Sequence, residues 1–214
     1  VVRIAPALIC VTSILKIKGV VMGILRIVLL LCMLICSQTV FAFDENRKGF
    51  ILGLGAGLHT TDIDFLNSGI SVGSDSEAGL ATSFKIGWGF TNQFSLYYVR
   101  NASWYSAPFS DGFTVSDTIF TLGISGAGVS YYFKPTAPSF YILGALGVGD
   151  LSAPFESNVE TDTGDAYMLG GGYEMSKHVM FELTWLDADI DSADLTTLKV
   201  EGSSIQFTVN YMWY

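Results

Sequence analysis

Residues 200–214 read V-E-G-S-S-I-Q-F-T-V-N-Y-M-W-Y, and this stretch decides the fold of the chain. Apolar side chains occupy every second position from Ile205 to Trp213, and polar side chains occupy the positions between them. A period of two predicts a β-strand with one apolar and one polar face. A strand of this kind that ends in aromatic residues is typical of a barrel whose apolar face contacts lipid.

Residues 22–42 have the composition of a secretory signal peptide. A short basic start is followed by an apolar segment and by Val40-x-Ala42, which matches a cleavage pattern. The apolar segment is shorter than the roughly 20 residues of a membrane-spanning helix, and an uncleaved anchor is the alternative. We expect residues 1–21 to be an upstream extension and residues 43–214 to form the folded domain.

The domain after position 42 contains no cysteine, because Cys10, Cys32 and Cys36 all precede it. This excludes a disulfide framework, a thiolate nucleophile and a thiolate zinc site in the mature chain. The same domain has seven basic and twenty acidic residues, which gives a formal charge of −13. Such a charge excludes a basic nucleic-acid-binding surface and indicates solvation, divalent cations or basic partners.

Eight segments of the domain alternate between apolar and polar side chains, or carry a glycine-rich second face. No segment after the leader has the 3.6-residue period of a helix. In the fourth segment the apolar phase changes between Ile124 and Val129, which predicts a β-bulge near residues 126–128. The predicted strands are residues 50–58, 80–90, 94–105, 118–133, 140–149, 166–174, 179–186 and the terminal strand in 200–214.

The connections between these strands alternate in length. Short connections are expected at 91–93, 134–139 and 175–178, and long ones at about 59–79, 106–117, 150–165 and 187–199. Short turns on one side and long loops on the other are the layout of an outer-membrane barrel. We therefore predict an all-β fold, an eight-stranded antiparallel up-and-down transmembrane barrel, with both termini on the periplasmic side.

A soluble eight-stranded barrel of the lipocalin type is the main alternative fold. Its outer face would be polar, whereas the faces that carry Phe84, Trp88, Phe181 and Trp185 are continuously apolar. The opposite faces carry Gly, Ser, Thr, Lys, Glu and Gln, which are too polar for a hydrophobic core. A barrel with lipid outside and polar side chains inside satisfies both observations.

The glycine-rich first strand, the eight strands, the long loops and the aromatic terminus resemble the small OmpA/OmpX-type barrel family. This resemblance implies the outer membrane of a Gram-negative bacterium, contact with lipid and lipopolysaccharide, and recognition of the last strand by the barrel-assembly machinery. One feature departs from the family pattern. The lipid-facing phase ends at Trp213, and Tyr214 is one residue beyond it.

Charged residues on the inward phase predict an internal ion pair. Lys85 and Glu182 lie on that phase, and Glu174 is a further candidate, whereas the pattern does not fix the direction of Arg100. An eight-stranded barrel is only wide enough for its own side chains. A narrow channel therefore conflicts with the strand count, and a structural ion pair is favoured.

The two histidines are predicted at opposite ends of the barrel, so they cannot share a site. His59 ends the first predicted strand, and His178 lies in a short turn. Lipid-modifying barrel enzymes of the PagP and PagL type use a histidine with a serine and a carboxylate near the outer leaflet. His59 with Asp62, Asp64 and a loop serine has that composition, but no nucleophile motif accompanies it. We favour a solvated loop histidine.

The long loops carry clusters of acidic residues. We favour solvated acidic loops, and weak binding of Ca²⁺ or Mg²⁺ is the alternative. The residues of the strongest cluster are Asp187, Asp189, Asp191 and Asp194, with Asp162 and Asp165 as further candidates. An EF-hand is excluded, because Ser192 and Leu198 occupy the positions of its glycine and its last glutamate.

The sequence thus predicts a non-enzymatic integral outer-membrane protein with no cofactor. Its acidic loops would support envelope integrity or contact ligands and surfaces outside the cell. The alternative is an outer-leaflet enzyme that modifies lipid A.

Overall fold

The computed structural model describes residues 47–110, 115–156, 161–191 and 198–214. The predicted upstream extension and signal peptide lie outside these ranges, and they stay predictions. Within the described residues, no helix is long and apolar enough to cross a membrane.

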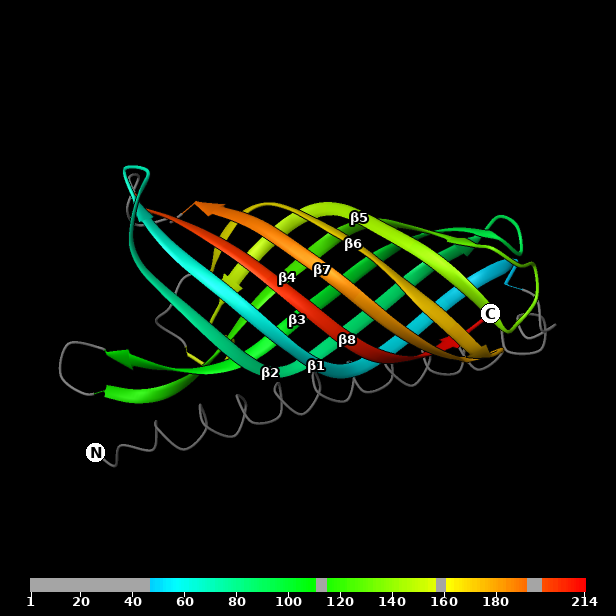
Figure 1. Cartoon of the computed structure of the whole chain (residues 1–214), viewed down its shortest axis with the longest axis horizontal. Coiled ribbons are helices and arrows are strands. Elements are labelled where there is room, and N and C mark those ends of the chain that lie inside the picture. The colour runs from blue at the N-terminus through cyan, green and yellow to red at the C-terminus, as the bar shows by residue number, and fades with distance from the viewer. Residues whose placement is uncertain (1–46, 111–114, 157–160, 192–197) are drawn as a thin grey trace, which may run out of the picture. The chain divides into compact units, whose positions relative to one another are not determined.

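Eight antiparallel strands form one closed barrel, in which each strand pairs with its sequence neighbours and β8 pairs with β1 (Figure 1). The predicted all-β, up-and-down architecture is confirmed. The strands are β1 (Gly49–Asn67), β2 (Ile70–Gly89), β3 (Phe94–Ser110), β4 (Val115–Tyr132), β5 (Ser139–Ser152), β6 (Asp162–Ser176), β7 (Val179–Asp191) and β8 (Leu198–Trp213).

The register of the pairing sets the tilt of the strands. Starting at Leu52 and moving from partner to partner around the barrel, the path returns to β1 at Asp62, which is ten residues further along. A shear of ten over eight strands corresponds to a tilt of about 40°. Each residue along a strand therefore advances by about 2.5 Å along the barrel axis.

The barrel has two different ends. The short-turn end carries the connections at residues 90–93, 133–138 and 177–178, together with the start of β1 and the end of β8. The hairpin end carries the far ends of four strand pairs, which are β1–β2, β3–β4, β5–β6 and β7–β8. Figure 1 shows the β1–β2 hairpin projecting there.

The predicted long loop at 59–79 is wrong, because the β1–β2 hairpin continues as paired strands to Asn67 and Ile70. A tight turn at Ser68 and Gly69 joins the strands, and both residues have positive φ angles, 52° and 81°. Glycine adopts this conformation without steric cost. The other three long connections are also shorter than predicted, since the strands that flank them extend further.

The bulge predicted near residues 126–128 is also wrong. The register of β4 with both neighbours is continuous there, and the shifts occur instead at Phe65/Leu66 and Glu174/Ser176. The change of phase has another cause. Leu122 and Ile124 are apolar but belong to the inward face, where both are fully buried.

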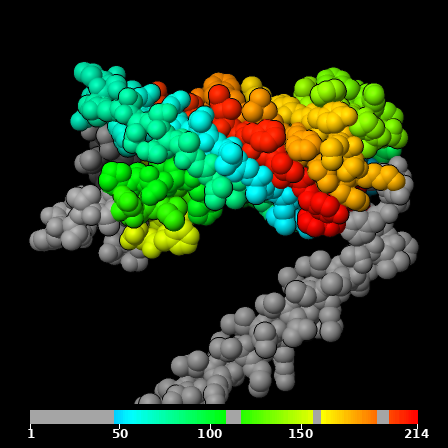
Figure 2. All heavy atoms as spheres, turned by 60° about the horizontal axis from the view of Figure 1, so that its bottom comes forward, coloured from blue at the N-terminus to red at the C-terminus, as the bar shows by residue number. Residues whose placement is uncertain are grey.

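The outward faces of the strands form an apolar belt. Figure 2 shows one side of it, where β8 lies between β1 and β7. Because large apolar side chains are exposed in this continuous band, the belt fits lipid and not water. Exposed members include Leu54, Leu80, Trp88, Phe140, Leu183 and Phe207.

The interior is filled by side chains in three levels. Tyr132, Tyr141 and Tyr214 are buried near the short-turn end, and apolar residues such as Ile63 and Ile190 are buried near the hairpin end. Polar residues from β2, β3, β7 and β8 are buried between these two levels. The middle level is therefore the polar part of the interior.

Candidate functional site: the barrel interior and its two ends

The middle level contains the ion pair of Lys85 on β2 with Glu182 on β7. The odd-numbered residues of β2 and the even-numbered residues of β7 face inward. Lys85 and Glu182 therefore both point into the barrel, and both are almost fully buried. The hydroxyl of Tyr141 donates a hydrogen bond of 2.7 Å to Oε1 of Glu182. The ammonium of Lys85 also lies 5.4 Å from the centre of the Tyr97 ring. The structure thus brings the two residues together as a neutral, hydrogen-bonded pair.

A chain of hydrogen bonds continues from this level toward the hairpin end. The amide of Asn101 donates to Gln206 at 3.0 Å, and the amide of Gln206 donates to Ser103 at 2.9 Å. Ser103 lies 2.7 Å from Ser204, which lies 2.9 Å from Thr61. All five residues are buried. These hydrogen bonds connect β3, β8 and β1 through side chains alone.

The prediction of a solvated loop histidine is wrong, because His59 lies inside the barrel and is only 4% exposed. Its Nε2 donates to the carbonyl oxygen of Trp104 at 3.0 Å, and its Nδ1 lies 2.8 Å from the hydroxyl of Thr61. The carboxylates of Asp62 and Asp64 are exposed on the opposite face of β1. The structure therefore does not bring His59 together with the two carboxylates that the sequence suggested.

A second buried ion pair, Arg47 with Glu174, closes the short-turn end. Nε of Arg47 donates to Glu174 at 2.9 Å, and Nη1 donates to the carbonyl oxygens of Asn92 and Lys134 at 2.6 and 2.7 Å. The guanidinium also lies 4.1 Å from the centre of the Tyr132 ring. Arg47 was missed by sequence reasoning, because it precedes the first strand and no pattern includes it.

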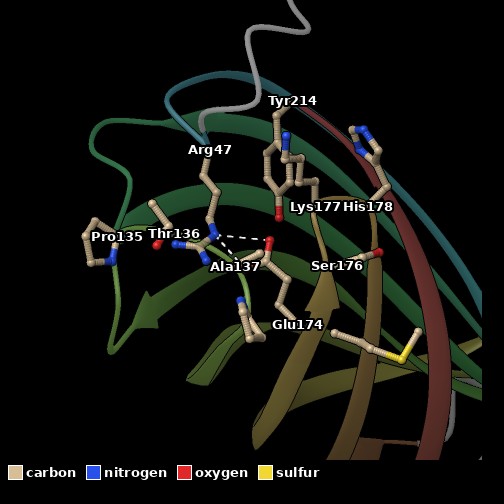
Figure 3. Close-up of a pocket in the computed structure, with 11 residues that line it drawn as sticks. Arg47, Pro135, Thr136, Ala137, Glu174, Ser176, Lys177, His178 and Tyr214 are labelled. Carbon is tan, nitrogen blue, oxygen red and sulfur yellow. Dashed lines mark hydrogen bonds and ion pairs between the residues drawn. The ribbon is translucent and has the colours of Figure 1, made fainter.

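A pocket of about 650 Å³ adjoins this pair at the short-turn end. Figure 3 shows Arg47 and Tyr214 pointing toward Glu174 in its wall. The hydroxyl of Tyr214 lies 3.4 Å from that of Tyr132, and the ring is buried. Nδ1 of His178 donates to the carbonyl of Met212 at 2.8 Å. The final aromatic side chain of the chain is therefore part of the interior.

Arg100 lies on the outward face of β3, which the sequence pattern could not decide. Its guanidinium reaches past Gly123 of β4 to the carboxylate of Asp150 on β5, with an Nη2–Oδ2 distance of 2.8 Å. The Arg100 side chain is 31% exposed and the Asp150 side chain is 15% exposed. Asp150 thus neutralises the charge of Arg100 on the outer wall of the barrel.

The candidate cation ligands Asp187, Asp189 and Asp191 lie on β7 and not in a loop, and Asp194 lies outside the described residues. They share the outward face. Asp189 is the direct register partner of Asp165 on β6 and of Glu201 on β8. Across the described ranges, no group of three acidic, histidine or cysteine residues is close enough to hold a metal ion.

The pKa of the Asp187 carboxyl is raised above its ordinary value. Burial is the largest cause and the charge of Asp189 is the second, while a hydrogen bond from Tyr167 acts in the opposite direction. Asp187 is the first outward residue beyond the apolar run that ends at Trp185, so it lies at the edge of the belt.

Three outer-membrane proteins are among the solved structures to which the chain is similar. The attachment invasion locus protein Ail of Yersinia pestis is 14% identical, covers 77% of this chain and 99% of its own, and gives a TM-score of 0.48. Neisserial surface protein A is 18% identical, with coverages of 77% and 97% and a TM-score of 0.48.

The outer membrane protein OprG of Pseudomonas aeruginosa is 18% identical, with coverages of 79% and 99% and a TM-score of 0.46. No curated protein matches the chain. The model of the outer membrane protein beta-barrel domain matches residues 28–212. The chain therefore belongs to the family of outer-membrane β-barrel proteins.

Proposed function

We propose that this chain is a non-enzymatic surface protein of the outer membrane, which uses its projecting hairpins to contact molecules outside the cell. The short-turn end, with both ends of the barrel domain, would face the periplasm, and the hairpin end would face the exterior. This orientation is supported by the general layout of such barrels, whose short turns are periplasmic. The filled interior speaks against transport through the barrel.

The observation that carries this proposal is the open edge of the β1–β2 hairpin. The pairing of β2 with β3 begins at Leu80 and Trp104, so residues 70–79 of β2 pair only with β1 in the described part of the chain. An open strand edge offers backbone groups for strand addition by an extended peptide. The apolar side chains of Ile70 and Val72 are exposed beside that edge.

The charge of the hairpin narrows the chemistry of the partner. Asp62, Asp64, Asp75 and Glu77 are on the hairpin, and the first three are exposed. They favour a basic partner and disfavour an acidic one. The expected partner is thus an extended, positively charged segment or surface.

Attachment of the purified protein tests this proposal. In nanodiscs of uncharged phospholipid, which hold no lipopolysaccharide, the protein should attach to a polylysine-coated surface, and shortening the hairpin by removal of residues 62–77 should abolish the attachment. A charge-matched control replaces Asp62, Asp64, Asp75 and Glu77 with their amides and keeps the hairpin, and its attachment should fall as well. Unchanged attachment by both variants would refute the proposal.

Weak binding of divalent cations would support envelope integrity. The carboxylates of β7 lie at the edge of the belt, near the depth of lipopolysaccharide phosphates, where bound Ca²⁺ or Mg²⁺ would relieve repulsion. Exposed carboxylates without a rigid cage bind at around 10⁻⁴–10⁻³ M. Millimolar Ca²⁺ should then slow proteolysis at the hairpin end. The same protection after Asp187, Asp189, Asp191 and Asp194 all become Asn would contradict this assignment.

One observation favours the enzymatic alternative. An apolar groove of about 580 Å³ on the outer wall is lined by Leu58, Leu80, Ile205 and Phe207, and His59 contributes to its wall. Both ring nitrogens of His59 are already engaged within the protein, which supports a structural role. Mass spectrometry of lipid A decides between the two. Identical lipid A from cells with the native chain, with His59→Ala and without the protein would exclude the enzyme.

A further inference from the structure

Three exposed lysines lie at the short-turn end of the barrel. Lys48 precedes β1, Lys134 lies in the connection between β4 and β5, and Lys177 lies in the turn between β6 and β7. Among the described residues, the one other exposed lysine is Lys199, which lies at the hairpin end and pairs with Asp191. The exposed positive charges are therefore concentrated at one end.

The same three lysines share one level along the barrel axis. Counted from the register with an advance of about 2.5 Å per residue, Lys48, Lys134 and Lys177 lie within about 3 Å of one another along the axis. By the same measure, Trp88 and Trp213 lie about 6 Å further toward the middle of the belt. The three lysines thus form a lysine ring outside the edge of the belt.

Aromatic side chains end the belt just before the lysine ring. Phe50 on β1 is the register partner of Trp88 on β2, and Trp213 on β8 contacts Tyr211. Aromatic residues at the edge of a transmembrane barrel mark the boundary between the lipid tails and the polar headgroups. The lysine ring is therefore at the depth of the headgroups. Exposed aromatic residues of this edge are Phe50, Trp88, Phe90, Phe133, Phe140 and Tyr211.

The acidic side chains lie at the opposite side of the belt. In the described ranges, the exposed and half-buried acidic side chains are all on the hairpin side. Glu174, at the short-turn end, is buried and paired with Arg47. Asp44 and Glu45 lie outside the described residues. The lysine ring is thus a basic surface on a domain that is otherwise strongly acidic.

We propose that the lysine ring binds the headgroups of anionic phospholipids. A lysine beside an anionic lipid surface is attracted to it, and its long side chain reaches from the edge of the belt to the phosphates. Its ammonium has three donors, so it binds a phosphate oxygen even where it also contacts the protein. In the orientation proposed above, the bound lipids belong to the periplasmic leaflet. The binding itself does not depend on that orientation.

Brominated phospholipids show which lipid contacts each end, because bromine quenches the fluorescence of a tryptophan that it touches. The chain has four tryptophans. Trp104→Phe with Trp185→Phe leaves the short-turn pair, Trp88 and Trp213. Trp88→Phe with Trp213→Phe leaves the hairpin-side pair and is the matched control. Each variant is folded into vesicles of equal parts phosphatidylcholine and phosphatidylglycerol, with bromine on one lipid or on the other. Both leaflets then have the same composition, so the orientation of the protein does not affect the result.

Phosphatidylglycerol should be enriched roughly threefold over phosphatidylcholine beside the short-turn pair, and not beside the hairpin-side pair. High salt should remove the enrichment, because it screens exposed charges. Changing Lys48, Lys134 and Lys177 to Gln should remove it as well, whereas Lys199→Gln should leave it unchanged. Equal quenching of the short-turn pair by the two brominated lipids would overturn the proposal, as would an enrichment that survives the three changes to Gln.

Discussion

Glu182→Gln should destabilise the barrel strongly, because it leaves the ammonium of Lys85 buried without a counter-charge. Breaking a buried ion pair by removal of one partner costs about 3–5 kcal/mol. The Tyr97 ring at 5.4 Å offsets about 0.5–2 kcal/mol of this cost. A net loss of about 3 kcal/mol corresponds to a fall of roughly 150-fold in the folded-to-unfolded ratio. Since domains have about 5–15 kcal/mol of stability, the variant should still fold.

Urea unfolding in lipid vesicles, followed by tryptophan fluorescence, measures this change. Glu201→Gln on β8 is the matched control, because that carboxylate is exposed on the outward face and its loss should change stability by less than about 1 kcal/mol. The double variant Lys85→Met with Glu182→Leu removes both charges and should recover most of the loss. An effect of Glu182→Gln no larger than that of the control would refute the reasoning, as would a double variant no more stable than Glu182→Gln.

Two further predictions concern the wall and the edge of the belt. A cysteine at position 84 should react with a lipid-soluble maleimide and a cysteine at 85 should not, since Phe84 faces outward and Lys85 inward; the reverse pattern would place the register wrong by one residue. Asp187→Asn should stabilise the protein at pH 7 and not at pH 3. Because the pKa of Asp187 is raised, the folded state holds the proton more tightly, and stability falls as the pH rises above the ordinary value of 3.8. Urea midpoints that shift equally at both pH values would contradict this assignment.

The strands within the apolar belt could be predicted because one face of each is apolar and the other polar or small. The hairpin end could not, since both faces of residues 70–76 are exposed and select no apolar period. Paired backbone groups keep that segment extended although its side chains do not show it. In β4 the apolar residues Leu122 and Ile124 lie on the inward face, where alternation predicts polar or small side chains.

The sequence predicts which side chains of the interior face inward, because alternation along a strand decides this, but it does not predict which of them contact one another. Lys85 and Glu182 could be placed inward from alternation, but their mutual contact depends on the shear, which no sequence pattern gives. His59 continues the inward phase of Gly53, Gly55 and Gly57, and this signal could have placed it inside the barrel. Arg47 carries no such signal, because its position depends on two turns and β6 meeting at the short-turn end.

The central claim is that the chain forms a closed barrel in the outer membrane, with every strand of the belt paired on both sides. Migration of the membrane-extracted protein on detergent gels, with and without boiling, tests it most directly. A closed barrel pairs its backbone groups internally and resists detergent, so the unboiled protein should migrate at a different position from the boiled protein and give a β-type circular dichroism spectrum. Identical migration of the two samples, together with a helical spectrum, would contradict the barrel.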